Sequence, residues 1–552
     1  MKFKFFKIIF FIYIFSFFRA NNQNKFKNNI NIAIIGSGSG GLSTAYFIVK
    51  NYFKNFHISN KYLLNLDIYE KDFNVGGRMK SINFNNSIVD MGASFFIKEN
   101  KLLLEILKVT ELKYTKAVED EEKNLLILNN KFEKLLCLDN GFYYNLTKLV
   151  YKYKLGIFNA NKIVDDLLKN IIDKIYNILD NQIYDNNYFS LQSLIKELNL
   201  KEMLSMSFYE YYKDKLNNLF LEEFIQSIII SCYSQKTKEV NAFTGSLILV
   251  TALKQAYKIY NGFGGLAKSL KNFLLNKSID YFTSLYNLLS NVSNISYKNE
   301  IKNKININFI NKKIINISKD ITSNNNSKYY LNYNDLELND KNKKTYDYVS
   351  VATGFNSSNI KFINFSNKNI NNYITLPKYK GVNITEILVK GKLNYKAFNL
   401  DQDGKTLYST ILFNDILSSK FNNISDIIRV GKINNNDLYK IQLSGEHVNE
   451  DKIRQLFVDN NNFSILNKTN WKEPYPELKP IKKNLLDFNT TSIVDYEFIK
   501  NERIYFNNAF EILASCVELA IISGKNVANI ILNEILKSSI NNQKNDNNKT
   551  DL

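Results

Sequence analysis

The sequence predicts an α/β fold: a Rossmann-like dinucleotide-binding domain with an inserted mixed α+β substrate domain. Three observations support this prediction. A glycine-rich turn separates an apolar strand from a helix near the N-terminus, within 31–49. A second apolar run, 346–354, ends in Ala-Thr-Gly, and a third, 503–506, precedes a long amphipathic pattern. Because parallel strands from distant parts of a chain complete one sheet in such folds, we expect a discontinuous nucleotide-binding domain.

The glycine-rich turn has the order of a phosphate-binding unit. The apolar run 32–35 is expected to form a strand and 42–49 a helix, and between them stand Gly36, Gly38, Gly40 and Gly41. In a G-x-G-x-x-G turn the first glycine permits the tight turn, the second admits a pyrophosphate, and the third lets the helix approach the strand. The helix N-terminus adds partial positive charge. A purely structural turn is the alternative, and the flanking strand and helix favour the dinucleotide.

An acidic residue ends the next expected strand. The run 66–70 closes with Glu70, which can accept a hydrogen bond from a ribose hydroxyl. Glu70 lies further from the glycines than the usual ~20 residues. We interpret the polar segment 51–65 as an inserted loop that accounts for the excess.

The residues after Glu70 indicate which dinucleotide is bound. Lys71 follows it directly, and Gly76, Gly77 and Arg78 stand five residues further on. This run resembles the E-x(5)-G-G-R signature of FAD-dependent oxidases such as flavin amine oxidases and phytoene desaturases. The resemblance implies that the paired glycines contact the FAD pyrophosphate and that the arginine donates to phosphate. A loop with a solvated charge is the alternative.

The segment 81–96 is expected to form a hairpin that ends in Asp-Met-Gly-Ala-Ser. In flavin oxidases a similar acidic-x-Gly-Ala element runs beneath the cofactor. The resemblance implies that Gly92, Ala93 and Ser94 contact the flavin or its ribityl chain. A plain turn is the alternative.

The C-terminal segment is expected to reach the same cofactor. The strand 503–506 is followed by Asn508 and Glu511, which have N-cap and N3 spacing, and by an amphipathic helix over 512–536. The dipole of that helix would stabilise negative charge on reduced flavin. The candidate cofactor contacts here are Glu511, Ala514 and Ser515. A surface helix without cofactor contact is the alternative.

Together with the resemblance to flavin oxidases, these motifs divide the chain into eight segments. We expect a signal peptide at 1–20, the first part of the FAD-binding domain at 30–100, a largely helical cap at 101–285, a low-complexity insert with short strands at 286–345, a returning FAD-domain strand at 346–360, a β-rich substrate domain at 361–490, the second part of the FAD-binding domain at 491–537 and a disordered tail at 538–552. Within the cap, an apolar segment is expected at 222–230 and a glycine turn that opens a helix at 267–276. Bulky apolar residues in the cap indicate core packing, with a lipophilic tunnel as the alternative.

The net charge of +19 suggests a nucleic-acid or anionic-membrane partner. The lysines are scattered and no nucleic-acid motif accompanies them, so we expect no nucleic acid, while peripheral membrane association stays open. The basic start, 1–7, and apolar run, 8–18, have the anatomy of a signal peptide cleaved near Ala20, with an uncleaved anchor as the alternative. The expected location is the secretory pathway, in a lysosome-like or vacuole-like compartment or outside the cell.

Cysteine and histidine usage excludes several site classes. Cys137, Cys232 and Cys516 show no C-x-x-C spacing, which argues against a disulfide framework, a zinc site or a thiol redox centre. His57 and His447 are the two histidines, and neither lies in a flavin motif. We therefore expect no metal and nominate no catalytic acid or base. Glycosylation sequons are frequent, but chance explains most of them in so asparagine-rich a chain.

Four further motifs resemble those of the prenylcysteine oxidase (prenylcysteine lyase) family. They are Leu-Val-Lys-Gly-Lys-Leu-Asn at 388–394, Trp-Lys-Glu-Pro-Tyr-Pro-Glu-Leu-Lys-Pro at 471–480, Tyr-Phe-Asn-Asn-Ala-Phe-Glu-Ile-Leu-Ala-Ser-Cys-Val-Glu at 505–518 and Asn-Ala-Phe-Thr-Gly-Ser at 241–246. The similarity runs in order from 32 to 536. The expected signal peptide agrees with the lysosome-type location of the family.

The resemblance implies an FAD-dependent oxidation of farnesyl- or geranylgeranyl-cysteine. Hydride would leave the carbon beside sulfur, water would add, and cysteine, a prenyl aldehyde and, from O2, hydrogen peroxide would result. One alternative is an amine-oxidase-like or desaturase-like FAD enzyme with another lipophilic substrate. A second is a non-catalytic prenyl-binding module like the Rab escort and GDP-dissociation-inhibitor proteins. The Gly-Gly-Arg motif and the signal peptide disfavour the second alternative.

Overall fold

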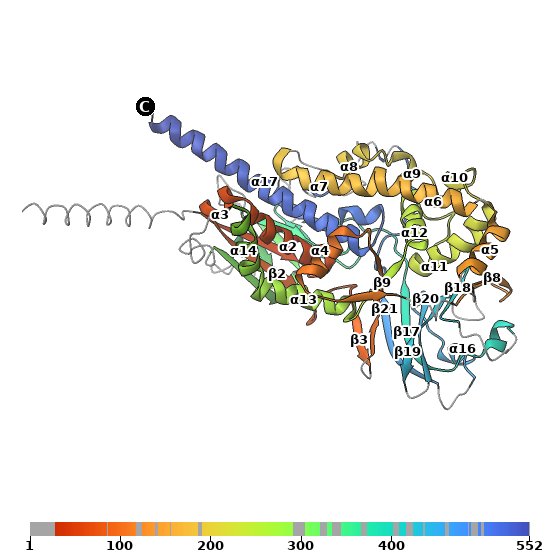
Figure 1. Cartoon of the computed structure of the whole chain (residues 1–552). Helices are drawn as coiled ribbons and strands as arrows, with labels where there is room; N and C mark the ends of the chain where they lie inside the picture. Colours follow the sequence, from red (N-terminus) through yellow and green to blue (C-terminus); the bar gives the residue numbers. More distant parts are fainter. Residues whose placement is uncertain are drawn as a thin grey trace, which may run out of the picture.

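The structure is a computed structural model of the whole chain. It describes residues 28–84, 87–117, 124–138, 142–154, 156–185, 190–290, 304–320, 328–333, 344–365, 373–400, 408–415, 423–433, 436–458, 463–483, 485–486, 495–497, 499 and 502–550. The expected signal peptide at 1–20 lies outside these residues. Figure 1 shows the nucleotide-binding part at one end of the molecule, and a helical layer and a large sheet together at the other.

A five-stranded parallel sheet forms the nucleotide-binding part, which confirms the Rossmann-like fold class. Its order is β10-β2-β1-β14-β22, with bounds Ile305–Asn311, Tyr62–Glu70, Asn28–Ile35, Tyr348–Val351 and Ile504–Phe506. Strand β14 is fully buried, and so are residues 32–35 of β1 and 66–69 of β2, as expected for parallel strands covered on both faces. Strands from four distant parts of the chain therefore meet in one sheet, and their carboxyl ends share one edge.

The interpretation of 51–65 as a loop is wrong. Helix α2 (Ser39–Lys54) continues into it, α3 (Phe56–Lys61) follows, and β2 begins at Tyr62. Tyr52 is fully buried, and its hydroxyl donates to the Tyr62 carbonyl at 2.7 Å. The stretch is rich in asparagine and lysine, but its aromatic residues Tyr52 and Phe53 are buried and continue the helix.

The interpretation of 286–345 as an insert with short strands is incomplete. Helix α14 (Ser278–Ser290) enters it, and β10 within it is an edge strand of the nucleotide-binding sheet. Its asparagines continue a ladder across three strands: Asn306 donates to Asn65 and Asn65 donates to Asn31, each at 2.9 Å. Low-complexity composition therefore concealed a regular strand whose polar side chains bond to one another. The residues 291–303, 321–327 and 334–343 lie outside the described part.

A smaller five-stranded sheet lies beside the nucleotide-binding part. Its order is β13-β12-β11-β15-β16, with bounds Thr345–Tyr346, Tyr329–Asn332, Asn316–Lys319, Lys361–Ile363 and Tyr373–Thr375. Since β15 and β16 belong to this sheet, the first part of 361–490 packs with the nucleotide-binding domain.

The cap contains the expected helices and also four strands. The helices are α4 (Lys101–Val109), α5 (Phe142–Tyr153), α6 (Gly156–Leu167), η2 (Leu168–Ile172), α7 (Asp173–Asp185), α8 (Leu191–Glu197), α9 (Lys201–Ser205), α10 (Phe208–Tyr212), η3 (Phe220–Ile225), α11 (Gln226–Tyr233), α12 (Ala242–Leu253) and α13 (Gly262–Asn276). The strands are β6 (Tyr114–Lys116), β7 (Leu125–Leu128), β8 (Lys134–Leu138) and β9 (Ala256–Ile259). Helix α13 begins at Gly262, ahead of the expected start at 267, so its glycines belong to the first turn.

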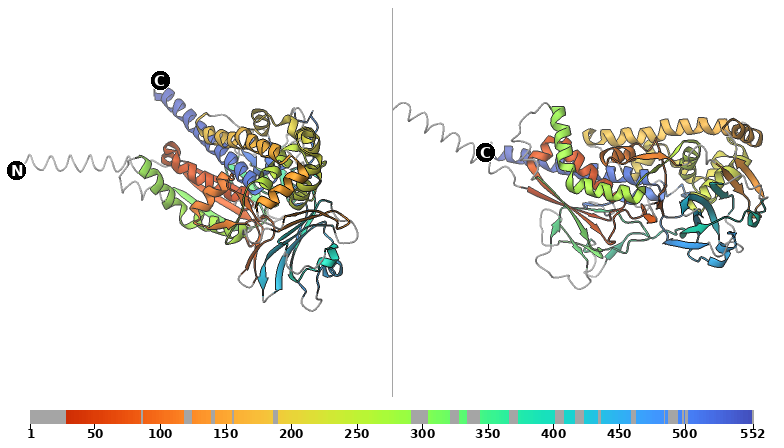
Figure 2. Two further views of the ribbon diagram at one scale, coloured as in Figure 1. Left: turned by 45° about the vertical axis from the view of Figure 1, so that its right-hand side comes forward. Right: turned by 60° about the horizontal axis from the view of Figure 1, so that its bottom comes forward.

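A seven-stranded sheet faces the helical layer of the cap (Figures 1 and 2). Its order is β21-β17-β20-β19-β18-β7-β8, in which the strands from the C-terminal half are β21 (Ser464–Trp471), β17 (Ile384–Gly391), β20 (Asn436–Ser444), β19 (Ile424–Ile433) and β18 (Thr410–Phe413). Neighbouring strands are antiparallel except β18 and β7. Two strands from the cap thus extend the β-rich domain.

The C-terminal helix starts later and ends later than expected. A 3₁₀ segment, η5 (Asn507–Ile512), follows β22, and α17 (Val517–Thr550) begins only after it. The prediction that Asn508 caps a helix from 512 is wrong, because η5 has no side-chain cap. The prediction of a disordered tail is wrong over 538–550, where α17 continues. The window Val517–Ser538 is long and apolar enough to cross a membrane, but 83% of it is buried, as in a core helix.

Candidate active site

The glycine turn after β1 allows very close contact between strand and helix. Gly36 has φ +101° and donates its N–H to the Tyr69 carbonyl at 2.8 Å. A Cβ at Gly41 would overlap the Gly36 carbonyl oxygen, so only glycine fits there. A Cβ at Gly524 of α17 would likewise overlap Ser43 of α2. Helix α2 is therefore held tightly between the sheet and α17, with its N-terminus fixed at the turn.

Gly38 is different, because a Cβ there would meet protein only at the Gly76 carbonyl oxygen, 3.9 Å away. Helix α2 starts at the next residue and has no side-chain cap. The first N–H groups of the helix therefore lack both intrahelical partners and a cap, which is the donor set that a phosphate group takes up. Gly40, by contrast, faces Asn508 and Ala520 of the C-terminal segment.

The Gly-Gly-Arg loop lies against the glycine turn. The Gly76 N–H donates to the Ser37 carbonyl at 2.9 Å, and Gly76 pairs with Gly38 as an isolated parallel bridge. Gly76 and Gly77 have φ +121° and +55°. Positive φ angles and the contact with Gly38 explain why the loop carries glycines. Two backbone loops thus border the space next to Gly38.

Glu70 lies at the end of β2, where the sequence predicted it. Its Oε2 accepts from the Ser37 N–H at 2.9 Å and from the Ser37 hydroxyl at 2.6 Å, and its Oε1 accepts from the Asp72 N–H at 3.0 Å. The carboxylate therefore braces the glycine turn and remains partly exposed beside it. Lys71 is exposed and Ala514 is buried. Neither residue lines the cavity described below, and the same holds for Glu70, Glu511 and the glycines at 36, 38, 40, 41, 76 and 77.

Arg78 joins the Gly-Gly-Arg loop to the C-terminal segment. Its guanidinium forms an ion pair with Glu511 at 2.5 Å and donates to the Pro474 carbonyl at 2.8 Å and the Ser515 hydroxyl at 3.2 Å. Glu511 is buried, and its Oε2 has no hydrogen-bond partner among the described residues. The expected N-cap partner is therefore a counter-ion, which sequence spacing could not reveal.

The segment after the hairpin passes directly over Arg78. The hairpin consists of β3 (Ser81–Phe84) and β4 (Ser87–Asp90), and β5 (Phe96–Ile97) follows. Gly92 has φ +144°, and a Cβ there would overlap the Arg78 carbonyl oxygen, which also accepts from the Ala93 N–H at 3.2 Å. Gly92, Ala93 and Ser94 all line the cavity.

Asp90 has a structural role that the sequence did not indicate. Its Oδ1 accepts from the Ser81 hydroxyl and from the Phe263 N–H at 2.8 Å, so it caps α13 from another element. Burial raises its pKa above the usual range.

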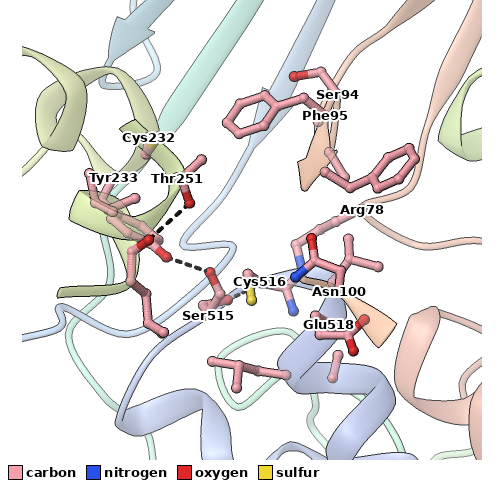
Figure 3. A pocket seen from close by; sticks show the side chains of 18 of the residues that line it. Arg78, Ser94, Phe95, Asn100, Cys232, Tyr233, Thr251, Ser515, Cys516 and Glu518 are labelled. Carbon is pink, nitrogen blue, oxygen red and sulfur yellow. Dashed lines mark hydrogen bonds between the residues drawn. The ribbon is translucent and has the colours of Figure 1, made fainter. Parts of the chain in front are cut away.

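A cavity of about 320 Å³ begins at the glycine turn and extends between the helical layer and the seven-stranded sheet. Figure 3 shows Arg78 and Asn100 on one side, Cys232, Tyr233 and Thr251 on the other, and Ser515 and Cys516 between them. One wall is mainly apolar and includes Phe95, Phe96, Leu103, Ile172, Leu247 and Ile248. The sheet wall carries charged and polar side chains: Glu386, Asp426, Lys440, Gln442 and Trp471.

Two side chains at the start of α17, Glu518 and Cys516, have raised pKa values. Glu518 caps α4, because it accepts from the N–H groups of Leu102 and Leu103 at 2.9 and 3.0 Å. It also accepts from the Tyr176 hydroxyl at 2.6 Å. Burial nevertheless raises its pKa to about 7. The Cys516 side chain is exposed to the cavity. The surrounding protein nevertheless desolvates its thiol, which raises the pKa to about 11. The thiol is therefore neutral at pH 7 and not an activated nucleophile.

The three cysteines are free thiols, and the described residues contain no group of side chains that could hold a metal ion. His447 is exposed and does not line the cavity, and the side chain of His57 lies outside the described part.

Two of the motifs that carried the family resemblance line this cavity, through Trp471, Pro474 and Tyr475 and through 515–518. The motif at 241–246 leads directly into Leu247 of the lining, whereas 388–394 does not line the cavity. Asn241 caps α12 and donates to the Leu513 carbonyl at 3.1 Å, and the Thr244 hydroxyl donates to the same carbonyl at 2.8 Å. Trp471 donates its indole N–H to Glu386 at 3.0 Å. These residues hold the C-terminal segment and the sheet wall in place.

The charged sheet wall was missed from the sequence. Glu386, Asp426 and Lys440 interrupt apolar strands, and each is almost fully buried. A charged residue inside an apolar strand is a signal that could have found them. Their proximity, however, depends on strand register across the sheet.

Comparison with known proteins agrees with the Rossmann-like nucleotide-binding part and with the family resemblance of the motifs. The family model described as prenylcysteine lyase matches residues 139–545, and the NAD(P)-binding Rossmann-like domain matches 34–108. Prenylcysteine oxidase 1 of Homo sapiens is 25% identical over 517 residues, which cover 90% of this chain and 88% of that protein. The Bos taurus protein is 26% identical over 517 residues, with 90% and 87% covered.

Solved structures show the same fold at low sequence identity. Cyclohexylamine oxidase from Brevibacterium oxydans has a TM-score of 0.53 at 11% identity and covers 92% of this chain and 100% of its own. A putative protoporphyrinogen oxidase from Exiguobacterium also has a TM-score of 0.53 at 11% identity, with 91% and 98% covered. The match of the family model over most of the chain shows that the protein belongs to the prenylcysteine lyase family.

Proposed function

We propose that the protein is an FAD-dependent thioether oxidase that cleaves prenyl-L-cysteine into free cysteine and a prenyl aldehyde. The observation that carries the proposal is the largely apolar cavity that reaches the glycine turn at Ser39 and the Gly-Gly-Arg loop at Arg78. Membership of the prenylcysteine lyase family and relatives named prenylcysteine oxidase 1 support the substrate. The overall reaction converts prenylcysteine, O2 and water into cysteine, prenyl aldehyde and hydrogen peroxide.

The residues around the glycine turn fit FAD. The open space at Gly38 and the uncapped start of α2 suit the pyrophosphate, and Glu70 has acceptor capacity left for a ribose hydroxyl. Gly76, Gly77 and Arg78 border the same space. Gly92, Ala93, Ser94 and Ser515 line the cavity beyond it. When bound, the flavin supplies the hydride acceptor and passes the electrons to O2.

The chain itself contributes binding, orientation and exclusion of water. The apolar wall takes up the prenyl chain, so that burial of its methyl and methylene groups drives binding. The two nucleotide loops would hold the cofactor next to Ser39 and Arg78, and binding of the prenyl chain at the apolar wall would orient the carbon beside sulfur toward it. No side chain is assigned as acid or base, which is consistent with a reaction whose hydride and electron steps belong to the cofactor.

The N-terminal sequence supports a location in the secretory pathway, in a lysosome-like or vacuole-like compartment or outside the cell. The positive net charge is compatible with peripheral contact to anionic membranes.

A product assay with alternative substrates tests the proposal. Purified protein is supplied with farnesylcysteine, geranylgeranylcysteine and a set of primary amines in air, and thiol, aldehyde and peroxide are measured. The proposal expects stoichiometric cysteine and peroxide from the prenylcysteines and none from the amines. Turnover of amines alone would indicate an amine-oxidase-like enzyme. Tight binding of prenylcysteine by flavin-free protein without turnover would indicate a prenyl-binding module.

A further inference from the structure

The charged side chains of the cavity wall lie on one face of three neighbouring strands. In the order β17-β20-β19, Glu386 pairs with Gln442 and Gln442 pairs with Asp426, and Lys440 stands two residues before Gln442. Paired residues, and residues two apart on one strand, share a face of the sheet. All four side chains line the cavity. Register thus assembles a compact polar patch, which we call the sheet-wall cluster.

Glu386 and Lys440 form a buried ion pair within the sheet-wall cluster. The Lys440 ammonium lies 3.2 Å from Glu386 Oε1, and the two side chains are only 7% and 3% exposed. Glu386 Oε2 accepts from the Trp471 indole at 3.0 Å. Within the described residues, Lys440 donates to Glu386 alone. Because an ammonium carries three donors, Lys440 retains donors that can reach a ligand in the cavity.

Asp426 lacks a full set of partners. Its Oδ2 accepts from the Ser231 hydroxyl of α11, whereas its Oδ1 is buried without a hydrogen-bond partner among the described residues. Desolvation raises its pKa to about 7, although the positive charge of Lys440 opposes this shift. A buried carboxylate oxygen without a partner is costly, so it calls for a specific explanation.

The composition of the sheet-wall cluster fits a ligand that carries both charges. Two carboxyl groups face one ammonium, which leaves an acceptor for a cation at Asp426 Oδ1. Lys440 offers donors for an anion a short distance away on the adjacent strand. The rest of the cavity is largely apolar. A molecule with an amino-acid head and a long apolar tail matches this distribution.

We propose that the sheet-wall cluster binds the zwitterionic amino-acid head of the substrate, with Asp426 accepting from the α-ammonium and Lys440 donating to the α-carboxylate. The inference rests on the proposed function, since it assigns the polar part of the same substrate. It makes Asp426 and Lys440 specificity-determining residues. A free α-amino group is then required, so a prenylated cysteine inside a peptide, whose nitrogen is an amide, is rejected by the unpaired carboxylate.

Two ligands and two variants test this inference. The ligands are farnesylcysteine and N-acetyl-farnesylcysteine, which lacks the cation. The variants are Asp426→Asn, which removes the charge and keeps the shape, and Asp437→Asn as a control, because Asp437 lies on β20 but pairs with Arg429 and does not line the cavity. Binding to the holoenzyme is read from the fluorescence of Trp471, the single tryptophan, which contacts Glu386.

We expect the native protein and the Asp437→Asn variant to bind farnesylcysteine about 10-fold to 100-fold more tightly than its N-acetyl form. In Asp426→Asn this ratio should fall close to one. A second variant, Lys440→Gln, should lose discrimination between farnesylcysteine and its carboxamide in the same way. Thermal unfolding of each variant shows that it is folded before ligand is added.

The outcomes separate the inference from the proposed function. Equal affinity of the native protein for both ligands, or an unchanged ratio in Asp426→Asn, overturns the inference even if prenylcysteine is oxidised. Native discrimination that disappears in Asp426→Asn supports the inference even if no oxidation occurs, in which case only the proposed reaction fails.

Discussion

The glycine turn and the sheet-wall cluster border the same cavity but are built in different ways. The turn is specified by backbone geometry: Gly36 and Gly41 lie where any Cβ would overlap protein, within a short stretch of sequence. The sheet-wall cluster is specified by side chains from three strands within 384–444, and one of its carboxylate oxygens has no hydrogen-bond partner among the described residues. Steric necessity therefore shapes the proposed cofactor end, whereas the proposed substrate end retains a polar atom that no described residue satisfies.

The largest effects are expected at the glycine turn, where two similar substitutions should act differently. Gly41→Ala places a methyl group on the Gly36 carbonyl and should destabilise the protein by more than ~3 kcal/mol or prevent folding. Gly38→Ala should leave the fold intact, because its Cβ meets only the Gly76 carbonyl oxygen, at an ordinary contact distance of 3.9 Å, and the φ of −71° suits alanine. It should instead reduce flavin content by about 10-fold or more, since the methyl group takes the place of the pyrophosphate.

Thermal unfolding and the flavin-to-protein ratio measure the two effects. A Gly38→Ala protein that retains full flavin content would contradict the assignment of the pyrophosphate to this turn.

The next effect is expected at the link between the two ends of the cavity. Arg78→Ala leaves Glu511 as a buried carboxylate without its cation, and should cost about 2 to 3 kcal/mol of unfolding free energy. Adding Glu511→Gln should restore at least half of the loss, because the buried charge is gone. Denaturant unfolding of both single variants and the double variant gives the coupling energy. Additive losses would show that the ion pair does not hold the C-terminal segment.

In the ligand-free protein, neutralising the Asp426 carboxylate of the sheet-wall cluster should increase the free energy of unfolding. The Asp426 pKa of about 7 lies above its value in the unfolded chain, so the native state binds more protons between these values. Native stability should therefore fall as pH rises from about 4 to 7, and then level off. The groups that face Asp426 are Lys440, Ser231, Glu386 and Gln442.

Asp426→Asn should make this decline smaller, with the remainder due to Glu518, whose pKa is also about 7. The variant should then be on the order of 2 kcal/mol more stable than the native protein at pH 8. Thermal unfolding at several pH values measures the difference. Equal pH profiles in the two proteins would show that Asp426 is not a desolvated carboxyl group.

The smallest effect is expected on the apolar wall. Phe95 is 41% exposed because it faces the cavity, so Phe95→Ala should change stability little. It should raise KM for farnesylcysteine about 3-fold to 10-fold with little change in kcat, as expected when uniform apolar binding is lost. Phe73→Ala is the matched control, because Phe73 is 90% exposed and outside the cavity. Similar kinetics for both variants would place the prenyl chain elsewhere.

The sequence predicted best what depends on local backbone rules. The strand, turn and helix around Gly36 and the position of Glu70 at a strand end follow from short patterns with one physical meaning. The sequence did not reveal β10, because that strand lies in an asparagine-rich stretch. It also placed the start of the C-terminal helix too early, because the 3₁₀ segment η5 precedes α17, which begins at Val517.

The charged residues of the cavity could not be placed from the sequence at all. Asp426 and Glu386 become neighbours of Gln442 only through the register of β17, β20 and β19, which no local pattern encodes. The Arg78–Glu511 ion pair likewise joins residues separated by most of the chain. Sequence therefore indicated the cofactor more fully than the groups that select the substrate.

The most direct test of the central claim is a single turnover without oxygen. Flavin-loaded protein is mixed anaerobically with farnesylcysteine while the visible flavin absorbance and the released thiol are followed. The account predicts that the flavin bands bleach and that one equivalent of cysteine and of prenyl aldehyde forms per flavin, with colour restored by O2. Flavin that stays oxidised in the presence of bound farnesylcysteine would contradict it.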